Sequence, residues 1–377
     1  MQRPITINDH GTFRESVREF VRNVLAPTYE QILADTSVPR AVWKEAGAHG
    51  LLGVQVPVEY GGAGMSDFRF NAIVAEEVSQ HSHSVASFLS VHSDVCAFHI
   101  AQLGTEGQKR RWLPDIAAGE KIWSMVAAQP THGSRTSARR ISAVRDGEDW
   151  VLDGVDSCVV NGVHADLFVV AASVGPAVGS EGITLFVVDS GMRGFSRRSK
   201  AAPHEFGTAD VFFDQVRLPD TNRLGPVSKG FAAMTDSSPR QRLAAAVADI
   251  GHAARILHDT TEHVGQRFTT GRSFGWSPVG KPMLSDMATS LNMVTAFLDY
   301  CMTAYARGEL SDADAAKVRR LSNDIRSQVM DRCLPSGRRG RTPTCCAGER
   351  RRGAGAVNAW LGTNDIRKEL IGRASGL

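Results

Sequence analysis

The feature that most limits the fold of this chain is a change in the spacing of its apolar residues, which occurs twice. Up to about residue 119, and again after Gly230, apolar side chains recur every three to four residues, as on one face of a helix. Between these segments lie short runs rich in Val, Ile and Phe, which are typical of β-strands. We therefore predict an α+β protein with a helical domain over 1–119, a β domain over 120–228 and a helical bundle over 229–377.

The strand-like runs follow one another without helical segments between them. They are DWVLDGVDSCVVNG, ADLFVVAASV, GITLFVVDS and ADVFFDQVRLP. Consecutive strands without crossover helices favour an antiparallel sheet or a barrel-like domain over a doubly wound parallel sheet. A dinucleotide site of the Gly-x-Gly-x-x-Gly type is therefore not expected.

Local signals set the expected helix ends. The TFRE pattern at Thr12–Glu15 is typical of a capping box, and the apolar stripe after it runs up to Pro27. Further helices are expected over 39–48, 67–79 and 84–103. After Gly230, three apolar stripes, one of them capped at Ser311, and a last helix that starts at residue 363 or 364 predict a four-helix-type bundle.

Charge and cysteine content exclude several classes of protein. Lys plus Arg number 43 and Asp plus Glu 40, so no global field indicates nucleic acid as a partner. The six Cys show no Cys-x-x-Cys spacing, and the first residues contain no apolar run for secretion or membrane insertion. We expect a reduced, cytoplasmic protein with neither a nucleic-acid nor a membrane partner.

A metal site is not expected. His258, Glu262 and His263, with His252 upstream, lie at helical spacing, and residues four apart share one face of a helix. No third ligand follows at a fixed spacing, so a solvated helix surface is the better interpretation.

Four phrases of the chain, together with the order of its segments, resemble the acyl-CoA dehydrogenase family of flavoproteins. They cover residues 50–66, 127–172, 212–219 and 361–373, and read GLLGVQVPVEYGGAGMS, AAQPTHGSRTSARRISAVRDGEDWVLDGVDSCVVNGVHADLFVVAA, FFDQVRLP and LGTNDIRKELIGR. The resemblance implies FAD held between the β domain and the bundle, and a homo-oligomer, either a tetramer or a dimer. It also implies α,β-dehydrogenation of an acyl thioester on CoA or an acyl carrier protein, with an unidentified electron acceptor.

The resemblance locates the catalytic base at two alternative positions, and neither holds a carboxylate here. A base must take the α-proton while the β-hydride passes to the flavin. In the family this base is a Glu before Gly-Thr at the start of the last helix, which is Leu361 here, or a Glu before Arg on a bundle helix, which is Gln241 here. Leu and Gln cannot accept the proton, so the catalytic residue stays unassigned.

The resemblance also implies which residues bind the cofactor and the substrate. Hydroxyl groups that would bond the flavin are missing at Ala128 and Val160, but backbone N–H groups serve the flavin too, and one neutral hydrogen bond contributes about 1 kcal/mol. Weakened FAD binding is therefore expected. Ser134 and Arg242 are expected to contact the substrate, and Arg267 to reach the FAD of a neighbouring subunit. The other expected FAD contacts are Met125, Ala127, Cys158, Asn161, Thr363 and Asp365.

Two basic segments depart from the family pattern. The cluster at 135–140, RTSARR, is either a solvated face or a contact for CoA phosphates or an acidic carrier protein. Residues 335–356, PSGRRGRTPTCCAGERRRGAGA, replace a Gly-rich loop and a short helix of the family, and their composition supports neither helix nor core. This segment is either a compensated frameshift or a disordered basic loop, and both hypotheses leave the flavin site incomplete.

Three functions are consistent with these departures. The first is an acyl-thioester dehydrogenase whose base has moved to another carboxylate. The second is a flavin-dependent monooxygenase on the same scaffold, which needs no base for an α-proton. The third is a non-catalytic homologue that binds a thioester or a partner subunit.

Overall fold

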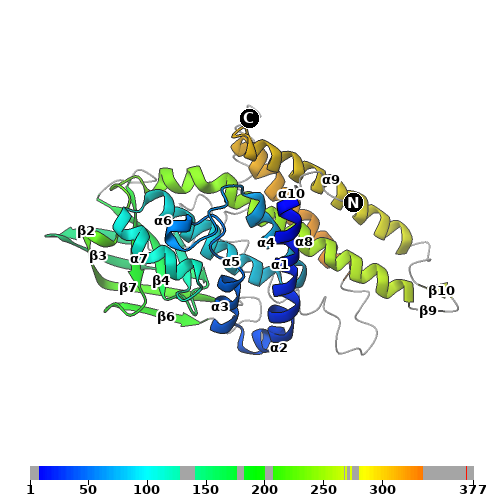
Figure 1. Cartoon of the computed structure of the whole chain (residues 1–377), viewed down its shortest axis with the longest axis horizontal. Coiled ribbons are helices and arrows are strands. Elements are labelled where there is room, and N and C mark those ends of the chain that lie inside the picture. Colours follow the sequence, from blue (N-terminus) through cyan, green and yellow to red (C-terminus); the bar gives the residue numbers. More distant parts are fainter. Residues whose placement is uncertain are drawn as a thin grey trace.

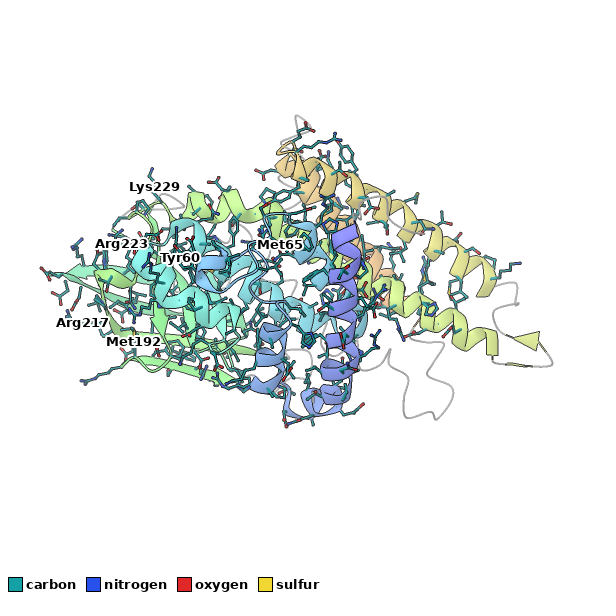
Figure 2. The ribbon with its side chains drawn as sticks, viewed as in Figure 1. Tyr60, Met65, Met192, Arg217, Arg223 and Lys229 are labelled. Atoms are coloured by element: carbon teal, nitrogen blue, oxygen red, sulfur yellow. The ribbon has the colours of Figure 1, made fainter. Side chains whose placement is uncertain are left out.

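The order of helices, sheet and helices that the sequence predicts is confirmed in a computed structural model. The structure describes residues 8–127, 141–175, 182–199, 207–266, 268–269, 272–273, 280–333 and 371. The N-terminal helices lie between the sheet and the C-terminal helices (Figure 1). Figure 2 shows Tyr60 and Met65 on the helical part of the molecule and Met192 and Arg217 at its sheet end.

The described residues of the N-terminal part, up to 119, contain helices and no strand. Its α-helices are α1 Asn8–Phe20, α2 Ala26–Asp35, α3 Arg40–Ala48, α4 Arg69–His81, α5 His83–Ser90, α6 Phe98–Leu103 and α7 Glu106–Ala117. Shorter elements are the π-helical turns η1 Val21–Leu25 and η3 Val91–Ala97 and the 3₁₀ turn η2 Val58–Tyr60.

Three details of the helix prediction were wrong. The helical path does not stop at Pro27, because this proline lies in the first turn of α2, which continues directly from the π-helical turn η1. The helix expected over 84–103 is three segments, since η3 widens its middle. Thr12–Glu15 lies inside α1, and the capping box is at Thr105 and Gln108 before α7.

The strands of the middle region form an eight-stranded sheet. They are β1 Trp123–Ala127, β2 Ser142–Asp146, β3 Asp149–Val160, β4 Leu167–Val174, β5 Ile183–Asp189, β6 Phe195–Ser199, β7 Thr208–Pro219 and β8 Arg223–Leu224. A 3₁₀ turn, η4 Asp220–Asn222, precedes β8. The order is β6-β7-β3-β2-β4-β5-β8, and β1 pairs with β4.

The sequence analysis expected an antiparallel sheet, but two of the strand pairs are parallel. β4 pairs in parallel with β1 along Trp123 to Ala127 and, over two residues, with β2, whereas the other pairs are antiparallel. The apolar runs predict strands but carry no information on direction, so this detail was not accessible from the sequence.

The C-terminal part consists of long helices. They are α8 Gly230–Gln266, α9 Gly280–Ala306 and α10 Asp312–Cys333, with β9 Phe268–Thr269 and β10 Arg272–Ser273 forming a hairpin between α8 and α9. Ser311 Oγ accepts a hydrogen bond from the Asp314 N–H at 3.0 Å, so the predicted cap is confirmed. Of the last predicted helix, residue 371 alone is among the described residues, and it is helical. α8 runs from the sheet to the far end of the molecule (Figure 1).

α8 lies close against α4, where a glycine allows the approach. A Cβ atom on Gly251 would come within 2.9 Å of the Glu76 carbonyl oxygen of α4. Apolar side chains of both helices, including Ala72 and Leu243, share one buried cluster with α9 and α10. A second cluster joins the N-terminal helices to the sheet. The two cores meet along α4 and α8.

A buried cluster of charges also fastens α8 to its neighbours. The carboxylate of Asp249 is bonded by Arg319, lies 2.9 Å from Arg326 Nε and accepts from Ser322 Oγ at 3.0 Å, all on α10. On its other side His83 Nε2 of α5 lies at 3.0 Å. Burial alone would raise the pKa of Asp249, but the two guanidinium groups and the His83 hydrogen bond hold it well below its usual range.

Candidate functional site

Two segments expected to bind the flavin lie side by side. Met125 and Ala127 belong to β1, whereas Cys158 and Val160 end β3 and Asn161 begins the turn after it. Met125, Val160 and Asn161 are buried, and the other two side chains are partly exposed. The structure thus brings together residues that are more than thirty positions apart in the sequence.

Hydrogen bonds hold these two segments together. The Asn161 side-chain amide donates to the carbonyl oxygen of Trp123 at 3.2 Å and to that of Phe88 at 3.0 Å. Ser124 Oγ of β1 donates to the carbonyl oxygen of Val160. Since Phe88 belongs to α5, the end of β3, the start of β1 and the helical layer are joined at one point.

The backbone at the end of β3 is unusual. Cys158 and Asn161 have φ angles of 61° and 62°, which lie in the left-handed region that non-glycine residues rarely adopt. The pairing of β3 with β7 shifts register between Asp156 and Val159, as in a β-bulge. Such conformations persist where surrounding structure holds them, and they are common beside binding sites.

The free edge of β1 suits a flat cofactor bound through backbone groups. Among the strands that the structure describes, β1 pairs with β4 alone. On its other edge the Trp123 N–H donates to His92 Nδ1 at 3.2 Å and the Trp123 carbonyl accepts from Asn161, whereas the backbone groups after Trp123 face no strand. Unpaired groups of this kind need partners. The loss of a hydroxyl at Val160 therefore leaves backbone donors of β1 in place, and the residues present fit a flavin.

A carboxyl group near this turn was missed in the sequence analysis. Asp156 lies on β3, two residues before Cys158, and is half-buried. Burial raises the pKa of Asp156 to about 6, with a further rise from Asp210, although the Ser157 N–H lowers it. An Asp in a strand with mixed polar residues gives no signal in the sequence, because its burial depends on the fold.

Two further expected site residues, Gln241 and Arg242, lie in the N-terminal half of α8. Gln241 Nε2 donates to Ser237 Oγ at 3.0 Å, and this oxygen lies 3.2 Å from His99 Nε2 of α6. The other ring nitrogen of His99, Nδ1, lies 2.7 Å from the carbonyl oxygen of Val95. Gln241 therefore ends a chain of hydrogen bonds that begins in the helical layer.

Two arginines flank Gln241 and differ in their contacts. Arg240 is buried between the rings of Phe68 and Phe98, with its Cζ atom 4.9 and 4.7 Å from their centroids. Its Nη2 donates to Asp94 Oδ1 at 2.9 Å. Arg242 is largely buried, and its nearest carboxylate, on Asp312, is 3.7 Å away. The Nε and Nη1 atoms of Arg242 have no hydrogen-bond acceptor in the described part of the chain. Burial lowers the pKa of Arg242, and Asp312 partly opposes this.

A cleft of about 210 Å³, open to solvent, lies beside Arg240 rather than beside β1. None of the expected flavin or substrate residues lines it. Its lining comes from the segment before α4, from α4 itself and from η3 and α6, and consists of Leu52, Gln55, Val56, Ser66, Asn71, Ser93, Ala97, Phe98, Ala101 and Gln102.

Comparison with known proteins decides the family. The acyl-CoA dehydrogenase N-terminal, middle and C-terminal domains match residues 8–120, 124–216 and 228–376. The chain is 31% identical to the long-chain specific acyl-CoA dehydrogenase of Rattus norvegicus over 98% of its length and 87% of the relative's. It is 30% identical to isovaleryl-CoA dehydrogenase of Solanum tuberosum, over 96% and 89%. The chain belongs to the acyl-CoA dehydrogenase family.

Solved structures agree with this assignment. The crystal structure of an acyl-CoA dehydrogenase from Geobacillus kaustophilus superimposes with a TM-score of 0.93 and 27% identity and covers 100% of both chains. Members of the acyl-CoA dehydrogenase family bind FAD, as the sequence analysis expected.

Several expected site residues lie outside the described part of this acyl-CoA dehydrogenase family member. They are Ala128, Ser134, Arg267, Leu361, Thr363 and Asp365, together with the segments 135–140 and 335–356. Within the described residues no group of three or more His, Cys, Asp or Glu could hold a metal ion, and His258 and Glu262 form an exposed pair at 3.6 Å. No described helix is long and apolar enough to cross a membrane.

Proposed function

We propose that the chain is an FAD-dependent oxidoreductase that removes hydrogen from the α and β carbons of an acyl thioester. The observation that carries this proposal is the match of all three family domains, in order, along the chain. The relatives compared above are named as dehydrogenases of acyl-CoA. The acyl group is carried by CoA or by an acyl carrier protein. The proposed domains are the helical domain 1–119, the β domain 120–228 and the helical bundle 229–377.

The chain's own residues have defined parts in this proposal. When bound, FAD supplies a hydride acceptor. The edge of β1 that does not pair with β4 and the turn at Cys158–Asn161 hold the flavin through backbone groups. Thr363 and Asp365 complete the site, together with Arg267 of a neighbouring subunit. Ser134 and Arg242 contact the thioester, and the unused donors of Arg242 support this role.

The α-proton requires an acceptor that neither Leu361 nor Gln241 provides. We propose a carboxylate elsewhere in the site, and Asp156 is the first to test. It lies near the flavin segments, and its pKa of about 6 is close to the range in which a general base works at neutral pH.

The substitution Leu361→Glu tests the proposed reaction. If flavin and substrate bind, a carboxylate at residue 361 raises dehydrogenation of acyl-CoA thioesters by about 10²- to 10⁴-fold, the usual contribution of a general base. Activity is followed with an artificial electron acceptor, and flavin content by absorbance. Leu361→Gln is the matched control, because it adds a polar group of similar size without a base.

The other outcomes are equally informative. Strong turnover of the unaltered protein, lost in Asp156→Asn, would identify Asp156 as the base. No turnover of the unaltered protein, together with no gain in Leu361→Glu with FAD bound, would contradict α,β-dehydrogenation. The missing carboxylates favour the flavin monooxygenase as the second candidate, and oxygen consumption with reduced flavin would separate it from a non-catalytic thioester-binding homologue.

We also propose a cytoplasmic homo-oligomer, a tetramer or a dimer. Large apolar side chains of the C-terminal helices support this, because Met293, Tyr300 and Leu321 are 63%, 61% and 43% exposed. Met293 and Tyr300 lie on α9 and Leu321 lies on α10. Apolar surface of this kind is commonly covered by a second subunit.

A further inference from the structure

A chain of hydrogen bonds joins a buried histidine to one of the two positions where the family carries its base. His99 and Ser237 are 1% and 2% exposed, whereas Gln241 is partly exposed. The chain runs from the Val95 carbonyl through His99 and Ser237 to the Gln241 side chain, with separations of 2.7, 3.2 and 3.0 Å. It crosses from η3 and α6 to α8, so both layers contribute to it.

The position of the proton on His99 follows from its neighbours. A carbonyl oxygen can only accept, so the short contact with Val95 requires a hydrogen on Nδ1. Burial lowers the pKa of His99 and Arg240 lowers it further, while the carbonyl groups of Val95 and Ala233 raise it. The net shift is downward. A lowered pKa favours the neutral ring, and with the hydrogen on Nδ1 toward Val95, Nε2 then carries a lone pair.

The hydroxyl of Ser237 then has one useful direction. Its single hydrogen can go to His99 Nε2 at 3.2 Å or to the Met234 carbonyl at 3.0 Å. Met234 lies in α8, where a carbonyl oxygen has a regular helical donor four residues on. His99 Nε2 is buried and would otherwise lack a donor, which is costly. Ser237 therefore donates to His99.

The remaining step fixes the amide of Gln241. Ser237 Oγ has already used its hydrogen, so it can only accept from residue 241. The Gln241 group that faces Ser237 must then be the NH₂ group, which agrees with the 3.0 Å contact from Nε2. The carbonyl oxygen Oε1 is left facing away from Ser237.

We propose that His99 is a positioning residue of the candidate active site, which acts through Ser237 to turn the Oε1 acceptor of Gln241 toward the acyl thioester. This inference rests on the proposed function for the identity of the ligand. The hydrogen-bond chain itself does not, because it is built wholly from described residues. Residue 241 then offers the substrate an oxygen that accepts a hydrogen bond but does not take a proton.

The ring nitrogens of His99 provide the direct test. In the full-length protein labelled with ¹⁵N-histidine, two-dimensional NMR distinguishes a protonated ring nitrogen from one with a lone pair, and His99→Gln assigns the signal. We expect the Nδ1–H form at pH 7. An Nε2–H form would overturn the proposal, since Ser237 would then have to accept from His99. This measurement requires neither flavin nor a further variant.

A substitution at the far end of the chain tests the coupling. In Gln241→Glu the carboxylate cannot donate to Ser237, so the hydroxyl turns toward residue 241 and His99 Nε2 loses its donor. His99 regains a bond by taking a proton that it donates to Ser237. The pH at which His99 is half protonated should therefore be higher in Gln241→Glu than in the unaltered protein. In the double variant Gln241→Glu/Ser237→Ala this rise should be absent. An unchanged midpoint in Gln241→Glu would contradict the chain.

Substrate provides the last arm of the experiment. Addition of an acyl-CoA thioester, with CoA alone as the control, should shift the His99 signals in the unaltered protein and not in Ser237→Ala. Binding of the thioester without any shift at His99 would overturn the positioning role. Failure to bind any acyl thioester, with the Nδ1–H form and the coupling intact, would instead contradict the proposed function.

Discussion

Helix α8 carries two buried polar regions, and they differ in how many partners the central side chain, Asp249 or Gln241, has. Around Asp249, two arginines, a serine and a histidine all converge on one carboxylate. Around Gln241, the contacts form a single neutral chain, and Arg242 retains donors that the described residues do not use. Opposite charges that converge on one carboxylate hold helices together, whereas a neutral chain beside an arginine with unused donors can still bind a ligand.

The largest effect is expected from Asp249→Asn. This change leaves Arg319 and Arg326 buried without their counter-charge, and breaking a buried pair in this way costs about 3 to 5 kcal/mol. Urea unfolding followed by circular dichroism measures the loss. Asp312→Asn is the control, because its carboxylate is 58% exposed and 3.7 Å from Arg242, so little change is expected. Equal losses in both variants would remove the distinction between the two regions.

A smaller effect is expected when the pH is lowered. Burial and the nearby Arg326 lower the pKa of His83 to about 4, although Asp249 opposes this. The unfolded chain takes up this proton near pH 6.5, so stability is lost as the pH falls from 6.5 toward 4, by roughly 3 kcal/mol for this group. His83→Gln should flatten the free energy of unfolding over this range, whereas His258→Gln, at an exposed site, should leave its slope unchanged. Identical slopes in the two variants would contradict the assignment.

The smallest effect is expected from Ser237→Ala. It removes the link between His99 and Gln241, and one neutral hydrogen bond contributes about 1 kcal/mol. Thermal and urea unfolding would show the change, with Ser285→Ala on the exposed face of α9 as the control. A loss as large as that of Asp249→Asn would mean that the Gln241 region is also a structural cluster, and the comparison would fail.

Apolar spacing predicted the order of the three parts because it reports which faces are buried. Together with local signals it predicted α3 nearly to the residue and the start of α10, since Pro39 and Ser311 precede these helices. Strand direction was not predicted, because alternation along β1 and β4 is the same in either direction. Local signals also misplaced helix ends where π-helical turns continue the path of the chain.

The candidate site was only partly accessible from the sequence. Family motifs predicted Gln241 and the two segments expected to bind the flavin. His99 and Ser237 carry no motif, and they meet because α6 packs against α8. Asp156 gained its raised pKa from burial in the sheet, which no local pattern predicts. Long-range packing created each of these features.

The close contact at Gly251 divides α8 mechanically. This helix of 37 residues is about 55 Å long at the usual rise per residue, and it is held near its middle by Glu76 of α4 and by the charges on Asp249. The half that carries Gln241 and the half that extends beside α9 are therefore separated by a firmly packed segment. A change in the half beside α9 is thus expected to leave the half with Gln241 in place.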